Sequence, residues 1–451
     1  MSSSIVLVAN AGESSISTFR VTESGLERLA VTTGTTGCSN LAVDPERDLV
    51  YASVKADDEN ADAGILTLSL DRETGVLTPR SRVALPGGAM NYLSLTREGS
   101  VLLGAAYSAG YGIACAVSPE GEVSPPVTEV RFPRLHSVLA SGDGRFAYFV
   151  SLETDLVAQF SIGDDLGLTP LEPATVAAPV GSGPRHLAFS DDETAVYVLT
   201  EFTGDVLHYA RDTATGTLEL RSATPAHDPS EKLGRSVIDE DPRANHYVWG
   251  ADIHLTDGVV WASERTASTL AALPIAGDGS LGEPGGFVVT ETQPRGFAVS
   301  PDRTLLVAAG EQTTMVSAYR VDGTDLELLG RFETGRGANW VRFACPRSAQ
   351  ELLRVELGDR DDPHARQLRV EGPGVVLEVE EPDAGDLRES GVAELLERQH
   401  ADAARPVGED AQVVDEVAVV ADEDDVVAVR LQGLKGALDA EVDFVEDRKS
   451  T

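Results

Sequence analysis

The stretch 181–204, GSGPRHLAFSDDETAVYVLTEFTG, holds a cation, an imidazole and a carboxylate in a spacing that could do chemistry. An apolar segment and a β-branched, aromatic segment flank a polar turn, a pattern that predicts a β-hairpin. Because the second strand of a hairpin runs antiparallel to the first, Arg185, His186 and Glu201 share one end of it. An imidazole and a carboxylate can exchange protons, and a guanidinium can hold an anion. This end of the hairpin is therefore a candidate site.

The elements that position this hairpin belong to a repeat. The pattern of strand, polar turn and strand recurs at 39–54, 91–107, 136–151, 185–201, 252–265 and 295–311. The residues that open the turns are separated by 52, 45, 49, 66 and 44 positions: Asp44, Thr96, Ser141, Ser190, Thr256 and Ser300. A period near 45 with four short strands per unit predicts propeller blades. The gap of 66 contains an insertion at 227–247, whose polar composition predicts a surface loop.

The ends of the repeat region supply one further blade. Six units run from about residue 40 to 335, while three strands in 5–31 and one inner strand in 339–346 remain at the two ends. Joining these strands would close the ring and protect its edges. We therefore predict an all-β fold, a seven-bladed propeller over residues 1–346 that is closed by its N- and C-terminal strands.

Residues 347–451 differ in composition. They contain 28 Asp or Glu against 12 Lys or Arg, and Phe444 is their only Phe, Tyr or Trp residue. Little aromatic or branched surface is left for a core, so we expect an acidic tail that is mostly disordered.

The repeat also predicts where a site should lie. Residues that enter the inner strands and residues that leave the second strands converge at one mouth of a propeller. Most of them are polar or charged here, whereas the opposite turns hold plain turn residues. The candidate site residues that enter or leave strands at this mouth are Asn91, His136, Arg185, His186, Glu201, Asp252, His254, Arg265 and Arg295. Taken singly, each could be an ordinary surface residue, cap or ion pair; together they form a candidate site.

Composition and missing motifs narrow the function. The formal net charge of −38 disfavours nucleic acid and anionic membrane surfaces as partners, although cations focused in one cleft could bind an anionic metabolite. Three scattered cysteines, no basic leader and no long apolar run predict a cytoplasmic protein with buried thiols. We find no metal-ligand set, dinucleotide fingerprint, Walker loop or GxSxG elbow, so we expect no metal and no cofactor. A ring closed by its own termini needs no partner, which favours a monomer.

Several blocks of the sequence resemble a known family. GSGPRHLAFS, LTEFTGDV, ADIHLTDG, SERTASTLAAL and TETQPRGFAVSPDRTLLVAAG are similar to blocks of the seven-bladed propeller lactonases, the bacterial 6-phosphogluconolactonase type, which is related to carboxymuconate lactonizing enzymes. The likeness covers about residues 4 to 346. The chain departs from the family pattern in three places, with TEF in the NEL-like block, ERTAS in place of DRTAS, and a missing proline in DIHLTDG.

The resemblance implies a function and roles. It implies hydrolysis of 6-phospho-glucono-lactone to 6-phosphogluconate, with a pocket formed by His136, Arg185, Glu201 and Arg295. We expect Glu201 or His136 to be the general base, and Arg185 to stabilise the oxyanion. Arg295, with Arg265 or His186, would hold the substrate phosphate, and Asn91, Asp252 and His254 would complete the substrate contacts.

Two other classes of function stay open at this point. A related enzyme could lactonize or hydrolyse a different ring, such as a carboxymuconate or an unphosphorylated sugar lactone. A propeller can also be a binding scaffold without catalysis.

Overall fold

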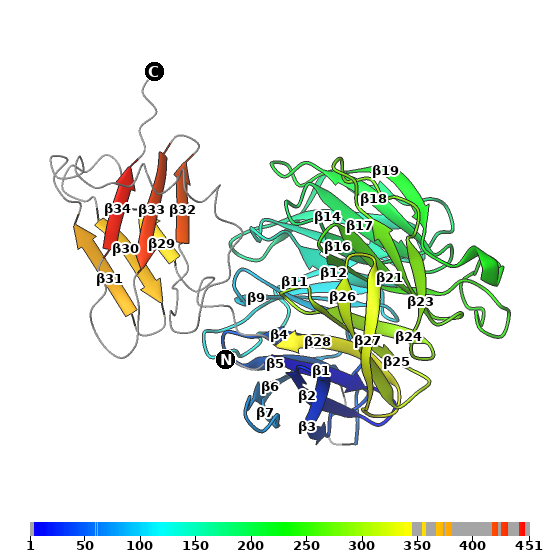
Figure 1. Ribbon diagram of the computed structural model, residues 1–451. Coiled ribbons are helices and arrows are strands. Elements are labelled where there is room, and N and C mark those ends of the chain that lie inside the picture. Colours follow the sequence, from blue (N-terminus) through cyan, green and yellow to red (C-terminus); the bar gives the residue numbers. More distant parts are fainter. Residues whose placement is uncertain are drawn as a thin grey trace. The chain divides into compact units, whose positions relative to one another are not determined.

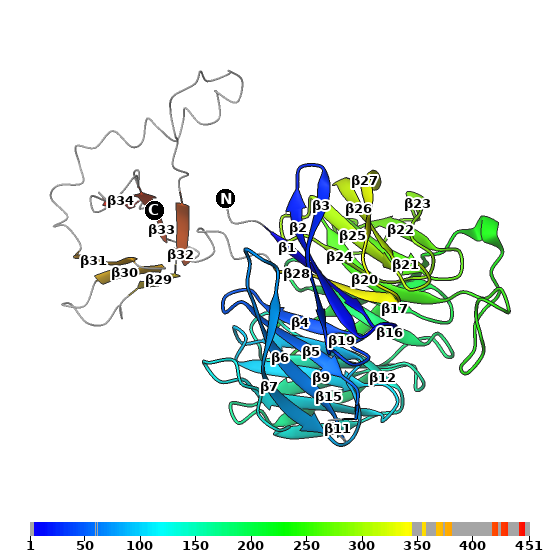
Figure 2. The ribbon, with the colours of Figure 1, turned by 90° about the horizontal axis from the view of Figure 1, so that it is seen from below.

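The computed structural model describes residues 4–58, 60 and 62–344, and the backbone of six short strands between 354 and 446. Residues up to 344 form seven four-stranded antiparallel sheets, arranged as the blades of a propeller (Figures 1 and 2). Within this part of the chain, a 3-10 helix at Pro229–Glu231, η1, is the only helix. The predicted all-β, seven-bladed propeller is confirmed.

Every blade has one inner strand, followed outward by three more. Blade 1 contains β28 (Ala338–Ala344), β1 (Ile5–Asn10), β2 (Ser15–Thr22) and β3 (Gly25–Thr33). Blade 2 contains β4 (Leu41–Asp44), β5 (Leu49–Val54), β6 (Ala63–Leu70) and β7 (Leu77–Leu85). Blade 3 contains β8 (Tyr92–Thr96), β9 (Val101–Ala106), β10 (Tyr111–Ala116) and β11 (Thr128–Arg131).

The remaining blades follow the same order. Blade 4 contains β12 (Leu135–Ala140), β13 (Phe146–Ser151), β14 (Leu156–Ile162) and β15 (Leu168–Ala177). Blade 5 contains β16 (Pro184–Phe189), β17 (Ala195–Thr200), β18 (Asp205–Arg211) and β19 (Leu218–Pro225). Blade 6 contains β20 (Gly250–Thr256), β21 (Val259–Glu264), β22 (Thr269–Pro274) and β23 (Gly286–Val289). Blade 7 contains β24 (Pro294–Val299), β25 (Leu305–Gly310), β26 (Met315–Asp322) and β27 (Asp325–Glu333).

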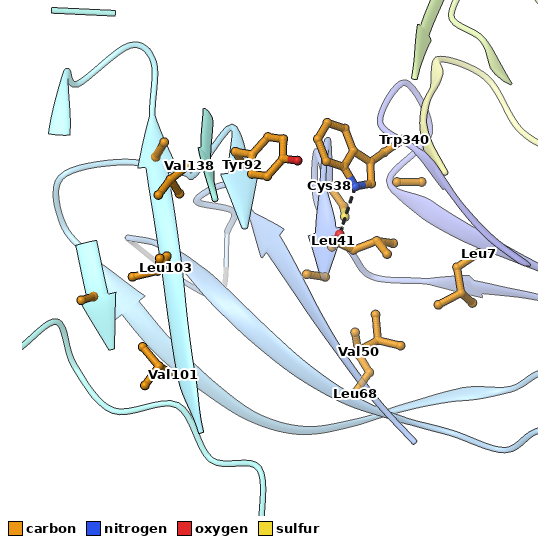
Figure 3. Packing of buried hydrophobic residues seen from close by; sticks show 14 of the residues in the cluster. Leu7, Cys38, Leu41, Val50, Leu68, Tyr92, Val101, Leu103, Val138 and Trp340 are labelled. Carbon is orange, nitrogen blue, oxygen red and sulfur yellow. Dashed lines mark hydrogen bonds between the residues drawn. The ribbon is translucent and has the colours of Figure 1, made fainter. Parts of the chain in front are cut away.

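The inner strands close a ring. Contacts run from β28 to β4, β8, β12, β16, β20 and β24 and back to β28. In blade 1 the last strand pairs with the first, with Ile5 opposite Ala344 and Val8 opposite Val341. Trp340 fixes this strand to the next blades, because its indole N–H donates to the Leu41 carbonyl at 3.0 Å and its ring lies 5.2 Å from that of Tyr92 (Figure 3). The predicted closure by the two ends of the repeat is confirmed.

The core lies between neighbouring blades. Second strands such as β5, β13 and β17 are buried over their whole length, because both of their faces are covered by adjacent blades. Their apolar, β-branched composition suits such a position. The outer strand β15, by contrast, is partly or fully exposed along its length. Burying the second strands holds their end residues, including Glu201 after β17, in fixed positions.

Buried tyrosines join successive blades. Tyr148 on β13 and Tyr197 on β17 occupy equivalent places, and both side chains are fully buried. Their hydroxyls donate to the carbonyls of Gly216 at 2.6 Å and Gly279 at 2.8 Å, each in the next blade. A buried phenol that keeps a hydrogen bond avoids the cost of an unpaired polar group, so each pair links two blades at fixed spacing.

The insertion between blades 5 and 6 forms a mostly exposed loop that begins with η1, in green in Figure 2. Cys38 and Cys115 are buried free thiols, as predicted; Cys345 lies outside the described residues.

Contacts divide the chain into two units, Met1–Pro346 and Arg347–Thr451. In the second unit, β29 (Arg354–Leu357), β30 (Gln367–Gly372) and β31 (Val375–Glu380) form one antiparallel sheet. A second sheet contains β32 (Val417–Asp422), β33 (Asp425–Leu431) and β34 (Val442–Glu446). The remaining residues of this unit lie outside the described part of the chain. The prediction of a mostly disordered tail concerns chiefly those residues.

Candidate active site

Three of the predicted site residues are extra residues in β-bulges at the start of inner strands. In β12 the pairing passes from Leu135 to Ser137 while the partner strand advances by one residue, so His136 is unpaired. The same shift leaves Arg185 unpaired in β16 and Arg295 unpaired in β24. A bulge breaks the strict alternation of a strand and changes the direction of a side chain. Bulges thus explain how these residues leave the blade interior and reach the mouth.

A glycine next to one bulge keeps two inner strands close. A Cβ atom on Gly296 would lie 2.5 Å from the backbone oxygen of Asn339 on β28. That distance is shorter than real contacts allow, so any side chain at this position must push β24 away from β28. Gly296 therefore helps to fix the position of its neighbour Arg295.

Glu201 lies between two arginines. Its Oε2 atom accepts from Arg185 Nε at 2.8 Å and lies 3.0 Å from Arg265 Nη2. The two arginine side chains are only 1% and 3% exposed, and that of Glu201 is 15% exposed. Because buried charges need a counterion, one carboxylate compensates two guanidinium groups that come from blades 5 and 6.

Trp249 completes this arrangement. Its indole Nε1 donates to Glu201 Oε1 at 3.2 Å, and the Arg265 guanidinium lies 3.7 Å from the ring centre, in a cation–π contact. Both oxygens of Glu201 are therefore engaged by donors. Burial alone would raise the pKa of Glu201, but the charges of Arg265 and Arg185 lower it below its usual value. Glu201 is ionised at neutral pH and weakly basic.

His186 connects Arg185 to Asp252. Its Nδ1 lies 2.7 Å from Asp252 Oδ1, and its Nε2 lies 3.2 Å from Arg185 Nη1. Since a guanidinium can only donate, Nε2 is the acceptor and Nδ1 carries the proton that is donated to Asp252. Burial and the charge of Arg185 lower the pKa of His186 to about 3, against the opposing effect of Asp252. The imidazole is neutral and positions Arg185.

Asp252 is anchored by the backbone as well. Its Oδ2 accepts from the amide of Phe297 at 3.2 Å, which ties β20 to β24. His254 lies further along β20, with Nε2 3.4 Å from Asp252 Oδ2 and its ring 4.8 Å from that of Phe297. Burial would raise the pKa of Asp252, but His254 and His186 hold it well below its usual range. Asp252 is thus a buried carboxylate that joins two blades beneath the arginines.

Within the described part of the chain, His136 forms no ion pair with the carboxylates of the site, unlike His186 and His254. It is buried, with its ring 5.0 Å from His186 and 5.5 Å from Tyr107. Its Nδ1 has no hydrogen-bond partner among the described residues. Burial, and then the charge of Arg185, lowers its pKa well below 6.5. His136 therefore presents a neutral imidazole beside the cationic cluster.

Arg295 is the most accessible of the three arginines, with 29% of its side chain exposed. Its Nη1 donates to Glu311 Oε1 at 3.1 Å, and Gln293 donates to the other carboxylate oxygen of Glu311. Its charge contributes to lowering the pKa of both His136 and Glu201, which places it within the same cluster. Arg295 therefore has donor capacity left for a ligand.

The predicted residues form one connected group. Asn91 is at its edge, where its Oδ1 accepts from the backbone amide of Tyr107 at 2.8 Å and holds Tyr107 beside His136. Residues that were not among the predicted site residues complete it: Trp249, Glu311, Gln293 and Tyr107. Glu311 and Tyr107 directly follow second strands, as Glu201 does, so their position in the repeat could have identified both as site residues. No feature of the sequence identifies Gln293 in this way.

A pocket of about 560 Å³ adjoins this group. It is lined by Trp249, Thr292, Gln293 and Gln312 from the blades and by Glu240, Asp241, Pro242 and Arg243 from the insertion. Because Trp249 contacts Glu201 and Gln293 contacts Glu311, the pocket lies against the carboxylates that hold the arginines.

The geometry is thus that of a polar mouth where Arg185, Arg265 and Arg295 lie near His136, whose Nδ1 has no hydrogen-bond partner among the described residues. The family described as lactonase, 7-bladed beta-propeller, matches residues 5–343. The chain belongs to this family. It is a lactone-hydrolysing enzyme, which confirms the prediction of a hydrolase that opens cyclic esters. The blocks that resembled this family in the sequence contain Arg185, Glu201 and Arg295 of the observed mouth.

Curated relatives cover most of the propeller. The chain is 28% identical to a 6-phosphogluconolactonase of Klebsiella pneumoniae over 308 residues, which cover 67% of this chain and 86% of that protein. It is 29% identical over 310 residues to a 6-phosphogluconolactonase of Pectobacterium carotovorum, with the same coverage.

Solved structures share the fold. A periplasmic gluconolactonase of Pseudomonas aeruginosa matches with a TM-score of 0.67 at 23% identity, over 77% of this chain and all of that one. A protein of Bacteroides fragilis, described as a putative 6-phosphogluconolactonase, matches with a TM-score of 0.66 at 23% identity, over 76% of this chain and 98% of that one. Over the described residues, no helix combines the length and apolar character needed to cross a bilayer.

Proposed function

We propose that this enzyme is a 6-phosphogluconolactonase, which hydrolyses 6-phospho-D-glucono-1,5-lactone to 6-phosphogluconate in the oxidative pentose phosphate pathway. The observation that carries the proposal is the convergence of Arg185, Arg265 and Arg295 beside the free imidazole of His136, in a chain of net charge −38. Concentrating cations in one cleft of an acidic protein suits an anionic substrate. The curated relatives that carry this name support the same choice.

His136 is the base in this proposal. Both oxygens of Glu201 already accept hydrogen bonds, Oε2 from Arg185 and Oε1 from Trp249, and Oε2 is also ion-paired with Arg265, whereas His136 Nδ1 is without a partner in the described part of the chain. His136 takes a proton from water as the water oxygen attacks the lactone carbonyl carbon. It then returns that proton to the ring oxygen as the carbon–oxygen bond of the ester breaks. Glu201 serves as the counterion that aligns the arginines.

Arg185 stabilises the oxyanion. Its Nε and Nη1 are held by Glu201, the Ala251 carbonyl and His186, so the guanidinium cannot rotate. A rigid donor aimed at the developing charge needs no reorganisation during the reaction, and such a donor contributes about 3 to 4 kcal/mol to lowering the barrier. His186 and Asp252 position Arg185 from below.

Arg295 binds the phosphate. It is the most exposed of the arginines, and its forked guanidinium matches the geometry of phosphate oxygens. The polar pocket beside Gln293 offers room for the end of the substrate that carries the phosphate. We further predict that the enzyme is a monomer and that it is located in the cytoplasm.

The test is lactone hydrolysis followed by proton release, with the purified full chain and with spontaneous hydrolysis subtracted. The 6-phosphorylated and the unphosphorylated lactone are compared at equal concentrations. We expect a clearly higher kcat/KM for the phosphorylated lactone. Equal rates would refute the phosphate clamp, and rates no faster than spontaneous hydrolysis would refute the assigned reaction.

A further inference from the structure

The insertion at 227–247 is anchored on a different blade from those it connects. Asp239 on the insertion binds Arg134 Nη2 with both carboxylate oxygens, at 2.9 and 3.1 Å. Arg134 precedes β12 of blade 4, and its Nη1 donates to the Tyr107 hydroxyl at 3.0 Å. The insertion leaves blade 5 and enters blade 6, so this pair draws it back toward the residues around His136.

The next residues of the insertion form one wall of the pocket described above. Glu240, Asp241, Pro242 and Arg243 face Thr292, Gln293 and Gln312, which belong to the loops of blade 7. The insertion therefore reaches from an anchor on blade 4 to a pocket beside blade 7. This course runs along the mouth that holds the three arginines.

Among the described residues, Arg243 is the one cation that lines the pocket. In the described part of the chain its guanidinium has neither a carboxylate within ion-pair distance nor a hydrogen bond, and the residue is exposed. The two acidic residues of the wall are engaged within the loop, since Glu240 accepts from Asn245 Nδ2 at 3.0 Å and Asp241 accepts from the Ala244 amide at 3.1 Å. All five donor groups of Arg243 are thus open to a ligand.

We propose that Arg243 is a specificity-determining residue, which binds the phosphate of the substrate from the insertion side while Arg295 binds it from the blade side. This inference rests on the proposed function, because it assigns the phosphate end of the lactone to this pocket. The wall carries two carboxylates and one guanidinium, so negative charge is in excess even with Arg243 present, and without Arg243 a phosphate would meet no cation on this side. Arg243 is therefore the residue that admits a phosphorylated lactone to an otherwise acidic wall.

The kinetic experiment uses Arg243→Gln and Arg243→Lys in the full chain, with both lactones. Losing a charge-assisted hydrogen bond predicts a 10- to 100-fold rise in KM for the phosphorylated lactone. We expect kcat and the parameters for the unphosphorylated lactone to stay the same, and the lysine variant to recover part of the loss. Glu240→Gln should act in the opposite direction and lower KM for the phosphorylated lactone.

The matched control is Lys232→Gln, which removes one exposed positive charge from the same insertion outside the pocket. It should leave both KM values unchanged. If Lys232→Gln raises KM as much as Arg243→Gln, the effect is a general one of loop charge, and the assignment of Arg243 is wrong. An unchanged KM in Arg243→Gln also overturns it.

Calorimetric binding of 6-phosphogluconate and gluconate separates this inference from the proposed function. We expect the wild type to bind 6-phosphogluconate more tightly, and Arg243→Gln to lose that preference. If the wild type fails to hydrolyse the phosphorylated lactone but shows this Arg243-dependent preference, the reaction is wrong and the phosphate site stands. If hydrolysis is found and Arg243→Gln binds both ligands like the wild type, the reaction stands and the phosphate site is wrong.

Discussion

Replacing Glu201 with glutamine tests whether this residue is a counterion or the base. The change removes the single carboxylate that accepts from Arg185 at 2.8 Å and lies 3.0 Å from Arg265, and leaves two guanidinium groups that are at most 3% exposed. Breaking a buried ion pair from one side costs about 3 to 5 kcal/mol. For a propeller of this size that corresponds to a melting temperature lower by about 4 to 7 °C.

Activity should fall together with stability. Without Glu201, Arg185 loses the bond that orients its guanidinium, so we expect a 100- to 1000-fold loss in kcat, the effect of removing one oxyanion donor. Melting temperature by calorimetry and kcat by proton release are the two measurements. Removing the second charge as well, in Glu201→Gln with Arg265→Gln, should restore part of the lost melting temperature, because one buried cation is gone.

An exposed ion pair provides the control for this substitution. Glu219 on β19 pairs with Arg221 at 2.9 Å, with both side chains more than half exposed. Glu219→Gln should therefore change stability by less than about 1 kcal/mol and leave the rate unchanged. If Glu201→Gln melts like the wild type yet loses its activity, Glu201 is not a counterion and the base would be reassigned to it. Full activity in this variant would exclude Glu201 from either role.

Three further changes address the base, the strand spacing and the insertion. His136→Gln should lower kcat by about 100-fold or more, and the acid limb of the wild-type rate should fall well below pH 6.5, since burial lowers the pKa of His136; a limb at 6.5 or above contradicts its role. Gly296→Ala should destabilise the propeller by about 1 to 3 kcal/mol in calorimetry, because its Cβ would lie 2.5 Å from a backbone oxygen, whereas Gly277→Ala, with open space around it, should not. Asp239→Asn should raise KM for the phosphorylated lactone less than Arg243→Gln does, with little change in stability for this exposed pair; an unchanged KM would show that the anchor to Arg134 does not position the pocket wall.

The fold could be predicted from the sequence because each blade repeats one pattern. The polar turns after the inner strands recur about every 45 residues, and the second strands are continuous apolar segments that only a structure covered on both faces can bury. The three strands at the N-terminal end and the one strand at the C-terminal end of the repeat region together make up one more four-stranded unit of the same pattern. Repetition made the mouth predictable as well, since every hairpin contributes the same end to it.

The geometry within the mouth could not be predicted. Whether His136, Arg185 or Arg295 faces a blade or the mouth depends on a single extra residue in each strand, and no residue type marks these bulges. The sequence also could not show which site residues have hydrogen-bond partners and which have none. The sequence places Glu201 and His136 at one mouth as candidate bases, but only the hydrogen bonds show that Glu201 is engaged on both oxygens.

The same bonds explain why one site needs so many charged residues for one reaction. A guanidinium that stabilises an oxyanion must be rigid and poorly hydrated, and burial of that kind is costly unless a carboxylate accompanies it. Glu201 and Asp252 meet this requirement in different ways: Glu201 pairs directly with two arginines, and Asp252 acts through the neutral His186. With these charges balanced among themselves, we assign the role of base to the residue that takes part in none of the pairs. That residue is His136. The β-bulge in its strand places it beside the cluster, but it forms no ion pair with the other residues there.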